Sequence, residues 1–191
     1  MSLSRLAMRI AAARALKGAT LAEARVFDSA VDPIDQTIAE TRQPILIVTT
    51  DDHEMEVTGR DLCHGNVSCD LVIEAAIASR VELNTPDDDG GEVTIAIPHT
   101  DEGMELALDV MEHQVMAALT RERSDWSRVW MKLVPRVSRR LSRRGASVEK
   151  GVRFAARQIV LTCDLIEAPT DGAEILPGST WEDVLAMMAL D

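Results

Sequence analysis

A cluster of acidic residues with one histidine is the first candidate for chemistry. The stretch TTDDHEME contains Asp51, Asp52, His53 and Glu54 directly after a run of apolar residues. Carboxylates and an imidazole near the end of a strand can bind a metal ion or transfer protons, so a metal-dependent hydrolase is one hypothesis. An acidic turn between two strands explains the same residues without chemistry. We favour this second interpretation, because patterns this short often occur by chance.

A second candidate is a zinc site formed by Cys63, His64 and Cys69, with His53 nearby. The spacing C-H-x4-C lacks the close pair of ligands that is usual in zinc sites. Cys69 also falls on the apolar face of a predicted strand, as Cys163 does, and cysteines in such positions are commonly buried. The sequence has no glycine-rich phosphate loop, no G-x-S-x-G and no H-E-x-x-H. We therefore predict that the chain is not an enzyme and binds neither a metal nor a cofactor.

Positive charge is gathered in one segment of an acidic chain. Residues 138–153 read SRRLSRRGASVEKGVR and contain five arginines, one lysine and one glutamate, whereas the whole chain has a formal net charge of −12. Close arginines would repel one another in an isolated helix, and the serines and glycine favour a loop. We therefore predict a long basic loop, residues 136–152, inserted before the last long strand. The cations proposed to contact an acidic surface are Arg136, Arg139, Arg140, Arg143, Arg144, Lys150 and Arg153.

Two interpretations of this segment are open. It is either a solvated surface loop without a partner, or an arm that becomes ordered against acidic surface on a neighbouring subunit or another protein. Nucleic acid is a less favoured partner. Outside residues 121–157 the chain has 8 basic and 29 acidic residues, and its only aromatic residues are two phenylalanines and three tryptophans.

The composition predicts an ordinary globular domain. The chain has 191 residues, of which 46% are hydrophobic and 27% are charged, enough for one domain with a hydrophobic core. No run of 18 apolar residues indicates a membrane span, and the N-terminus lacks the continuous apolar centre of a signal peptide. Three cysteines without paired spacing fit a reducing compartment. We therefore expect the protein to be located in the cytoplasm when it is made.

The elements that position these residues follow from hydrophobic periodicity. Residues 3–17 predict a helix that ends at Gly18. Its apolar stripe would consist of Leu3, Leu6, Ile10 and Ala13. Strands are predicted at residues 25–27, in the apolar run QPILIVTT, in the alternating HEMEVT and in VTIAIP. The clearest strand covers residues 67–78. One face would consist of Val67, Cys69, Leu71, Ile73, Ala75 and Ile77, and the other would include the polar Ser68, Asp70 and Glu74.

The second half of the chain predicts two helices and further strands. A helix is expected over residues 104–119, and its buried stripe would consist of Met104, Leu108, Met111, Val115 and Leu119. We expect Leu71 and Ile73 to be buried against this helix. The stretch WSRVWMKLVPRV predicts a strand, and residues 159–165 predict the last long one. Ser179 and Glu182 have the spacing of a capping box that opens a short C-terminal helix.

These elements together predict an α+β fold. It would consist of a single, mostly antiparallel or mixed sheet covered by an N-terminal helix and a central helix, with a long basic loop and a short C-terminal helix. Residues 1–168 would form the domain, and residues 169–191 would form a C-terminal extension.

The N-terminal half also resembles a known family. The helix RLAMRIAAARALKGAT is followed by RVFDSAVDPID and then by QPILIVTTDD. This succession is similar to that of the tail terminator (minor tail, tail-completion) proteins of long-tailed bacteriophages, which open with a helix, a small passage containing "rVf" and "dp", and a proline-led apolar strand that ends in Thr-Asp. The later order is similar as well: a strand around LVIEAA, a helix around ALDVMEHQVMAAL, and a final strand after an arginine-containing loop. The resemblance covers roughly residues 3–167.

The resemblance implies a virion structural protein without enzymatic activity or cofactor. Its copies would form a homo-hexameric ring, assembled in the host cytoplasm, that caps the head-proximal end of the tail tube, terminates tail polymerisation and provides the head–tail joining surface. The implied partners are the chain itself, the tail tube protein and the head–tail connector protein. DNA would pass through the lumen without specific binding, and no membrane would be involved.

Two questions stay open after this resemblance. A head–tail connector or neck subunit is the alternative to a tail terminator, because it would share the ring and differ in its neighbours. The basic segment and residues 169–191 depart from the shorter members of the family, so their contacts are not implied by the resemblance.

Overall fold

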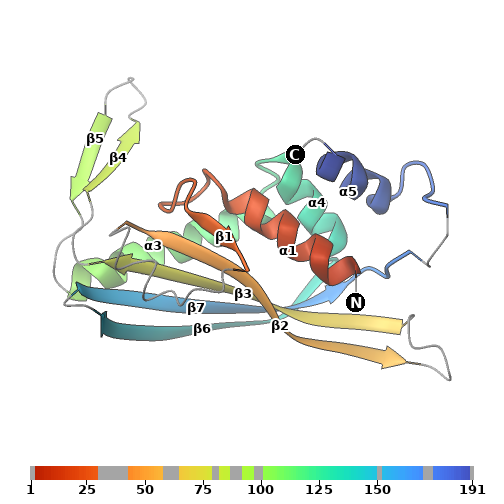
Figure 1. Cartoon of the computed structure of the whole chain (residues 1–191), viewed down its shortest axis with the longest axis horizontal. Helices are drawn as coiled ribbons and strands as arrows, with labels where there is room; N and C mark the ends of the chain where they lie inside the picture. The colour runs from red at the N-terminus through yellow and green to blue at the C-terminus, as the bar shows by residue number, and fades with distance from the viewer. Residues whose placement is uncertain are drawn as a thin grey trace.

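The computed structural model describes residues 3–29, 43–57, 65–78, 82–86, 92–96, 101–149, 152–169 and 174–189. The first part contains helix α1 (Leu3–Leu16) and strands β1 (Val26–Asp28), β2 (Ile45–Val57) and β3 (Gly65–Ala78). Strands β4 (Glu82–Pro86) and β5 (Glu92–Ala96) follow, and then helices α3 (Asp101–Thr120) and α4 (Asp125–Leu133). Strands β6 (Arg136–Glu149) and β7 (Val152–Leu165) and helix α5 (Thr180–Ala189) complete the order (Figure 1).

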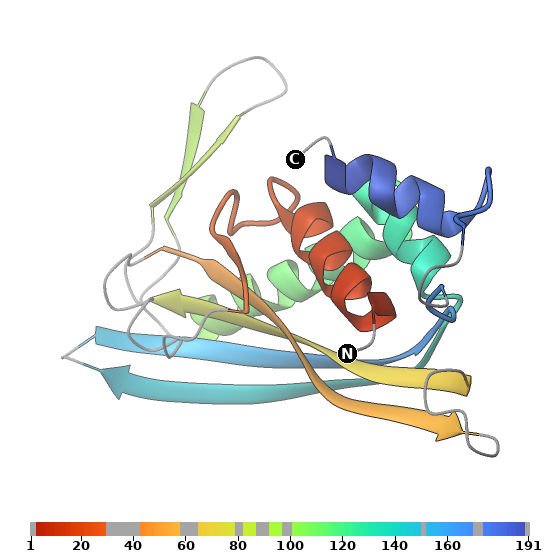
Figure 2. The ribbon, with the colours of Figure 1, turned by 45° about the vertical axis from the view of Figure 1, so that its right-hand side comes forward.

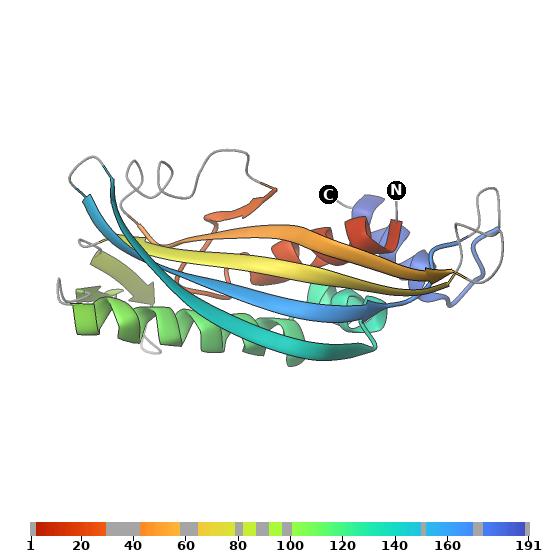
Figure 3. The ribbon, with the colours of Figure 1, turned by 90° about the horizontal axis from the view of Figure 1, so that it is seen from below.

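Five strands form one mixed sheet in the order β1-β2-β3-β7-β6. β1 pairs with β2 in parallel, and every other neighbouring pair in this sheet is antiparallel. β4 and β5 pair with each other in a separate two-stranded sheet. β2 and β6 lie toward opposite edges of the main sheet, as Figure 3 shows. The predicted α+β class with a mixed, mostly antiparallel main sheet is confirmed.

The main core lies between the sheet and the helices (Figure 2). Alternate side chains of β3, among them Leu71 and Ile73, reach this side, which we call the helix face. The side on which Val72 and Glu74 lie is called the second face. The core side chains of the helices are buried on the helix face, and they include Met8 and Leu16 of α1, Leu108 and Met111 of α3, and Trp130 and Leu133 of α4.

The prediction for the central helix is confirmed. The five stripe positions of α3 are at most 4% exposed, and Leu71 and Ile73 belong to the same core with no exposed surface. α3 packs against β3 and β7. The apolar face of the strand and the apolar stripe of the helix thus pack against each other as the sequence predicts. Burial of apolar area favours the orientation in which both are removed from water.

The predicted stripe of the N-terminal helix is wrong except at Ala13, which is 4% exposed and belongs to the core. Leu3 is 47% exposed and Leu6 and Ile10 are half-buried, whereas the alanine-rich side of α1 is buried. Small side chains let a helix approach its neighbours closely, so tertiary packing selects the alanine side over the side with larger residues. The end of the helix is as predicted, since Gly18 follows it with a φ of +71°, a conformation that favours glycine.

The stretch WSRVWMKLVPRV forms helix α4 over most of its length, and the predicted strand is wrong. Ser124 caps the helix: its side chain accepts a hydrogen bond from the backbone N–H of Ser127, whose own hydroxyl accepts one from Ser124. Ser127, Val129, Trp130 and Leu133 are buried at helical spacing. Tryptophan and valine favour a strand locally, and the cap together with the buried stripe outweighs that preference.

The predicted basic loop is also wrong, because residues 136–149 form strand β6 and pair with β7 along their length. Side chains of a strand alternate between its two faces. Arg140 and Arg144 therefore lie on the helix face, and Arg139 and Arg143 lie on the second face. The strand separates the arginines onto two faces of the sheet, which reduces the repulsion that they would have in a helix. The register shift between Val137 and Arg139 determines which arginines share a face.

The predicted C-terminal helix is confirmed as α5. Ser179 Oγ accepts a hydrogen bond from the backbone N–H of Glu182 at 3.3 Å, as the capping box predicts. The Glu182 carboxylate accepts one from the backbone N–H of Gly178 at 2.5 Å, one residue earlier than the standard box. Val184 is 2% exposed and belongs to the main core, so α5 packs with the rest of the described chain.

Candidate interaction surface

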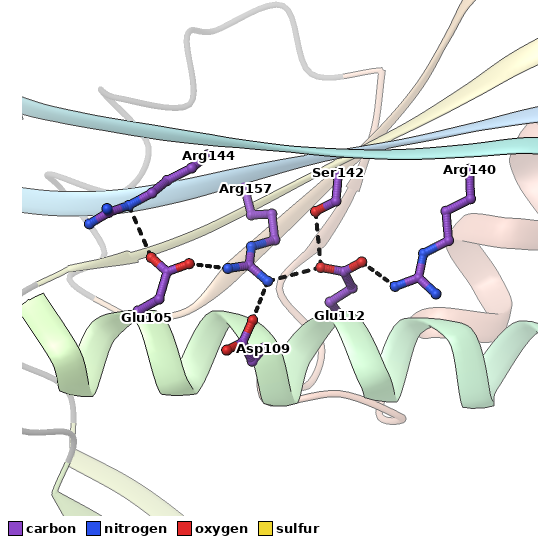
Figure 4. Close-up of polar contacts among 7 residues, drawn as sticks. All are labelled: Glu105, Asp109, Glu112, Arg140, Ser142, Arg144 and Arg157. Carbon is purple, nitrogen blue, oxygen red and sulfur yellow. Dashed lines mark hydrogen bonds and ion pairs between the residues drawn. The ribbon is translucent and has the colours of Figure 1, made fainter.

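Charged side chains of β7 and α3 meet on the helix face (Figure 4). The guanidinium of Arg157 in β7 donates to three carboxylates of α3: Glu105, Asp109 and Glu112, the last with an Nη1–Oε2 distance of 2.9 Å. These acids are spaced at i, i+4 and i+7, which places them on one side of the helix. The side chains of Arg157 and Glu112 are only 11% and 9% exposed, so their charges compensate each other away from bulk water.

β6 adds two arginines and a serine to this group. Arg140 donates to Glu112, and the Ser142 hydroxyl donates to the same carboxylate with an Oγ–Oε2 distance of 3.0 Å. Arg144 Nε lies 3.0 Å from Glu105 Oε2, an ion pair without the alignment of a hydrogen bond. The α3–β6 network, as we call it, consists of Glu105, Asp109, Glu112, Arg140, Ser142, Arg144 and Arg157 (Figure 4).

The network sets the protonation of its central groups. Burial by itself would raise the pKa of Glu112, but the hydrogen bonds from Arg140, Arg157 and Ser142 outweigh it and lower that pKa below its ordinary value. Burial would likewise lower the pKa of Arg157, and the hydrogen bonds to Asp109 and Glu112 raise it instead. Both groups are therefore charged at neutral pH, and the network joins β6, β7 and α3 electrostatically.

The second face presents arginines of a different kind. Arg139 and Arg143 are exposed and make no hydrogen bond or ion pair with the described residues. The residues of β7 that pair with them, Thr162 and Gln158, form hydrogen bonds with β3 instead. Thr162 donates to Asp70 at 2.6 Å, and Gln158 donates to Glu74 at 3.1 Å. These two guanidiniums are consequently available to a partner.

The predicted interaction residues thus divide into three groups. Arg140 and Arg144 form ion pairs inside the chain, with Glu112 and Glu105 respectively, and their contact with another molecule stays a prediction. Arg136, Arg139 and Arg143 remain as candidates; Arg136 is 73% exposed, and its Nε lies 3.8 Å from the Asp164 carboxylate. The remaining two add no contact, because Lys150 lies outside the described residues and only the backbone of Arg153, in β7, is described.

Sequence reasoning missed Arg157 and its acidic partners. The signal was present in α3, where Glu105, Asp109 and Glu112 follow a helical spacing beside the predicted buried stripe. A carboxylate that is buried beside such a stripe, as Glu112 is, needs hydrogen-bonding or cationic partners. Nothing in the sequence indicates which cations supply them, because Arg140 is 28 residues and Arg157 is 45 residues away from Glu112.

The acidic stretch after the first apolar run does not form a turn between two strands. It continues β2, with a register shift between Thr50 and His53. His53 lies opposite Cys69 on the helix face, whereas Glu54 lies opposite Ser68 on the second face. Asp51 and Asp52 occupy the shift and are exposed. The imidazole and the Glu54 carboxylate therefore point to different sides of the sheet, which does not favour their joint use in a hydrolytic site.

The cysteines of the described strands lie in the core. Cys69 and Cys163 are opposite each other on β3 and β7, each at most 1% exposed. Burial raises the pKa of Cys69 to about 11 and that of Cys163 to about 12, so both thiols are protonated at neutral pH. Cys63 and His64, the other residues of the zinc site that we considered and did not favour, lie outside the described residues.

Comparison with known proteins adds no constraint. No family model matches the sequence, and no curated protein has significant similarity to it. Within the described part of the chain, no helix is both long enough and apolar enough to cross a membrane. The function must therefore be argued from the residues and their arrangement.

Proposed function

We propose that the chain is a structural subunit of a bacteriophage virion, a tail terminator that caps the head-proximal end of the tail tube as a homo-hexameric ring. In this role it stops tube polymerisation and provides the surface to which the head connector binds. The proposal includes no catalysis and no cofactor. DNA passes through the lumen of the ring without specific binding.

One observation carries the proposal. The passages that resemble the family, RLAMRIAAARALKGAT, RVFDSAVDPID and QPILIVTTDD, include α1, β1 and the first part of β2, and residues 30–35 of the second passage lie outside the described residues. These elements pack together: α1 contacts β1 and β2, and β1 pairs in parallel with β2, with Val26 opposite Leu46 and Asp28 opposite Val48. The resemblance therefore follows a packed unit rather than scattered residues. Similar passages that pack together into one structural unit support the proposed family better than similar loops would.

The experiment is electron microscopy of the purified protein mixed with purified tail tubes of the phage that encodes it. We expect added density at one end of each tube, with sixfold symmetry in averaged end views, and tubes that no longer elongate when tube protein is supplied. Bare tube ends, or a ring with another number of subunits, would contradict the proposal.

The same experiment separates the terminator from a neck or connector subunit. A connector binds the portal of DNA-filled heads and leaves isolated tube ends bare. Samples of heads without tails are therefore mixed with the protein in parallel. Density on heads alone would replace the proposed function with the connector function, whereas density on tube ends alone would support the terminator.

A further inference from the structure

The two edges of the main sheet carry opposite charge. β6 forms one edge and exposes Arg136, Arg139 and Arg143. At the other edge, β1 pairs only with Leu46 to Val48 of β2. The rest of β2 runs on without a described partner strand on that side and exposes Asp51, Asp52, Glu54 and Glu56.

These charges stand at the same level along the strands. The pairing register connects Glu54 of β2 through Ser68 and Asp164 to Arg136 of β6. Because directly paired residues of antiparallel strands share a face, all four side chains of this row lie on the second face. Arg139 occupies the next second-face row, together with Thr162 and Asp70.

Two aspartates of β2 lie at the level of Arg139. Asp51 and Asp52 lie in the register shift of β2 between the residues paired with Leu71 and Cys69, which is the level of Asp70. Two copies placed side by side, without a slip along the strands, would therefore bring the acidic end of β2 against Arg136 and Arg139. In that arrangement Glu54 and both arginines are on the same face, as a sheet that continues from one copy to the next requires.

We propose that this chain binds a second copy of itself head to tail, with the first half of β6 from one copy docked along Thr50 to Glu56 of β2 in the next. The occupant of each edge is thus the opposite edge of another copy. This inference rests on the proposed function only for the closure of the chain of copies into a ring; the contact itself follows from the sheet.

The direction of the strands suits this contact. β1 and β2 run in one direction, β3 in the other, β7 again with β2, and β6 against it. If the copies are related by rotation about an axis along the strands, β6 of one copy runs antiparallel to β2 of the next. A contact between two different edges is heterologous, and such contacts produce closed rings when the rotation closes.

Charged edges also have a protective role, because they keep exposed strands from pairing with other sheets. Protection alone is best served by the same sign on both edges, since like charges repel. Here the signs differ, so the edges attract each other and repel their own kind. Complementary charge of this sort selects the partner and the register of docking.

The test uses charge reversal at each edge. The basic-edge variant is Arg136→Glu with Arg139→Glu, and the acidic-edge variant is Asp51→Lys with Glu54→Lys. Association of each protein is measured by sedimentation velocity over a range of concentrations at low and physiological salt. We expect the wild type to associate more strongly at low salt and each variant to lose at least about tenfold in association constant.

The matched control is Arg121→Glu with Arg123→Glu. These exposed arginines follow α3 and belong to neither β2 nor β6, and their reversal changes the net charge as much as the basic-edge variant does. This control is expected to associate as the wild type does. Thermal unfolding followed by circular dichroism checks that all variants are folded.

Mixing supplies the decisive measurement. In the basic-edge variant, positions 136 and 139 present negative charge to the acidic residues of β2. In the acidic-edge variant, positions 51 and 54 present positive charge to the arginines of β6. Each variant alone should therefore associate more weakly than the wild type. An equimolar mixture restores a complementary contact at every junction, and we expect association near the wild-type level with the two variants in alternation. A misfolded variant could not produce this rescue.

Three results would overturn the inference: a wild type that stays monomeric at every concentration and salt, variants that associate as the wild type does, or a mixture without rescue. These outcomes are distinct from failure of the proposed function. A protein that associates as described and leaves tail tubes bare retains the contact and loses the function. A protein that caps tubes with unchanged efficiency in both edge variants retains the function and loses the contact.

Discussion

Replacing Arg157 with alanine tests the central claim about the α3–β6 network. Its side chain is 11% exposed and is the shared partner of three carboxylates, of which Glu112 is 9% exposed. Removing one member of a buried ion pair costs about 3–5 kcal/mol, because the other charge stays buried without compensation. Glu112 keeps its contacts with Arg140 and Ser142. We therefore expect a loss at the lower end of that range, about 3 kcal/mol in the free energy of unfolding.

The assay is urea-induced unfolding followed by circular dichroism, with Arg139→Ala as the control. Arg139 is an arginine of the neighbouring strand, exposed on the second face and without a described partner. Its removal should change the free energy of unfolding by no more than about 0.5 kcal/mol.

A double variant separates loss of charge compensation from loss of packing. Replacing both Arg157 and Glu112 by methionine removes the main buried pair together, and such replacements are often neutral. We expect the double variant to be more stable than Arg157→Met alone, which is a coupling that a thermodynamic cycle measures directly. Equal losses for Arg157→Ala and Arg139→Ala, or strict additivity in the cycle, would refute the reasoning.

Three further results are expected. Because the pKa of Glu112 is lowered in the folded state, its contribution to stability is complete above the ordinary value of 4.5 and is lost as pH falls through the folded pKa; Glu112→Gln should flatten the acid limb of the stability–pH curve, and an unchanged limb would contradict this. Leu71→Ala should cost about 2–5 kcal/mol in urea unfolding, since it empties a fully buried site; a change near zero would mean that the packing is wrong. In a Cys63→Ser background, Cys69 and Cys163 should resist a thiol reagent at pH 8 until the protein unfolds, because both thiols are buried with pKa values of about 11 and 12; rapid labelling of the native protein would exclude this burial.

The elements with a strong local pattern were predictable from the sequence. β3 has an apolar residue at every second position from Val67 to Ile77, and α3 repeats its apolar residues every three or four positions, so the buried helix face dictates both patterns. The burial of Leu71 and Ile73 followed from the same logic. In α1 the period was right and the side was wrong, because alanines carry little hydrophobic signal and yet pack most closely.

The basic strand could not be predicted in this way. Its sequence does not alternate apolar and polar residues as a half-buried strand does. The partners of Arg140 and Arg144 are carboxylates of α3, which are far away in the sequence. The strand state of β6 therefore depends on a tertiary contact that compensates charge rather than on local preference. The candidate site could be predicted only in part for the same reason. The sequence identifies the arginines, but only the pairing of β6 with β7 shows that Arg140 and Arg144 lie on one face and Arg139 and Arg143 on the other.

The register shift beside Ser138 has a consequence for how this segment can vary. The arginines of β6 come in two doublets, RR-LS-RR, so each face receives one arginine from each doublet. Gain or loss of a single residue before the first doublet would exchange the two faces and still leave each face with its arginines. Within residues 139–144, the residues misplaced would be Leu141 and Ser142, since the serine hydroxyl that reaches Glu112 would give way to a leucine. The doubled arginines thus make the charge pattern robust to insertions and deletions, while the two residues between them determine which alignment is the more stable.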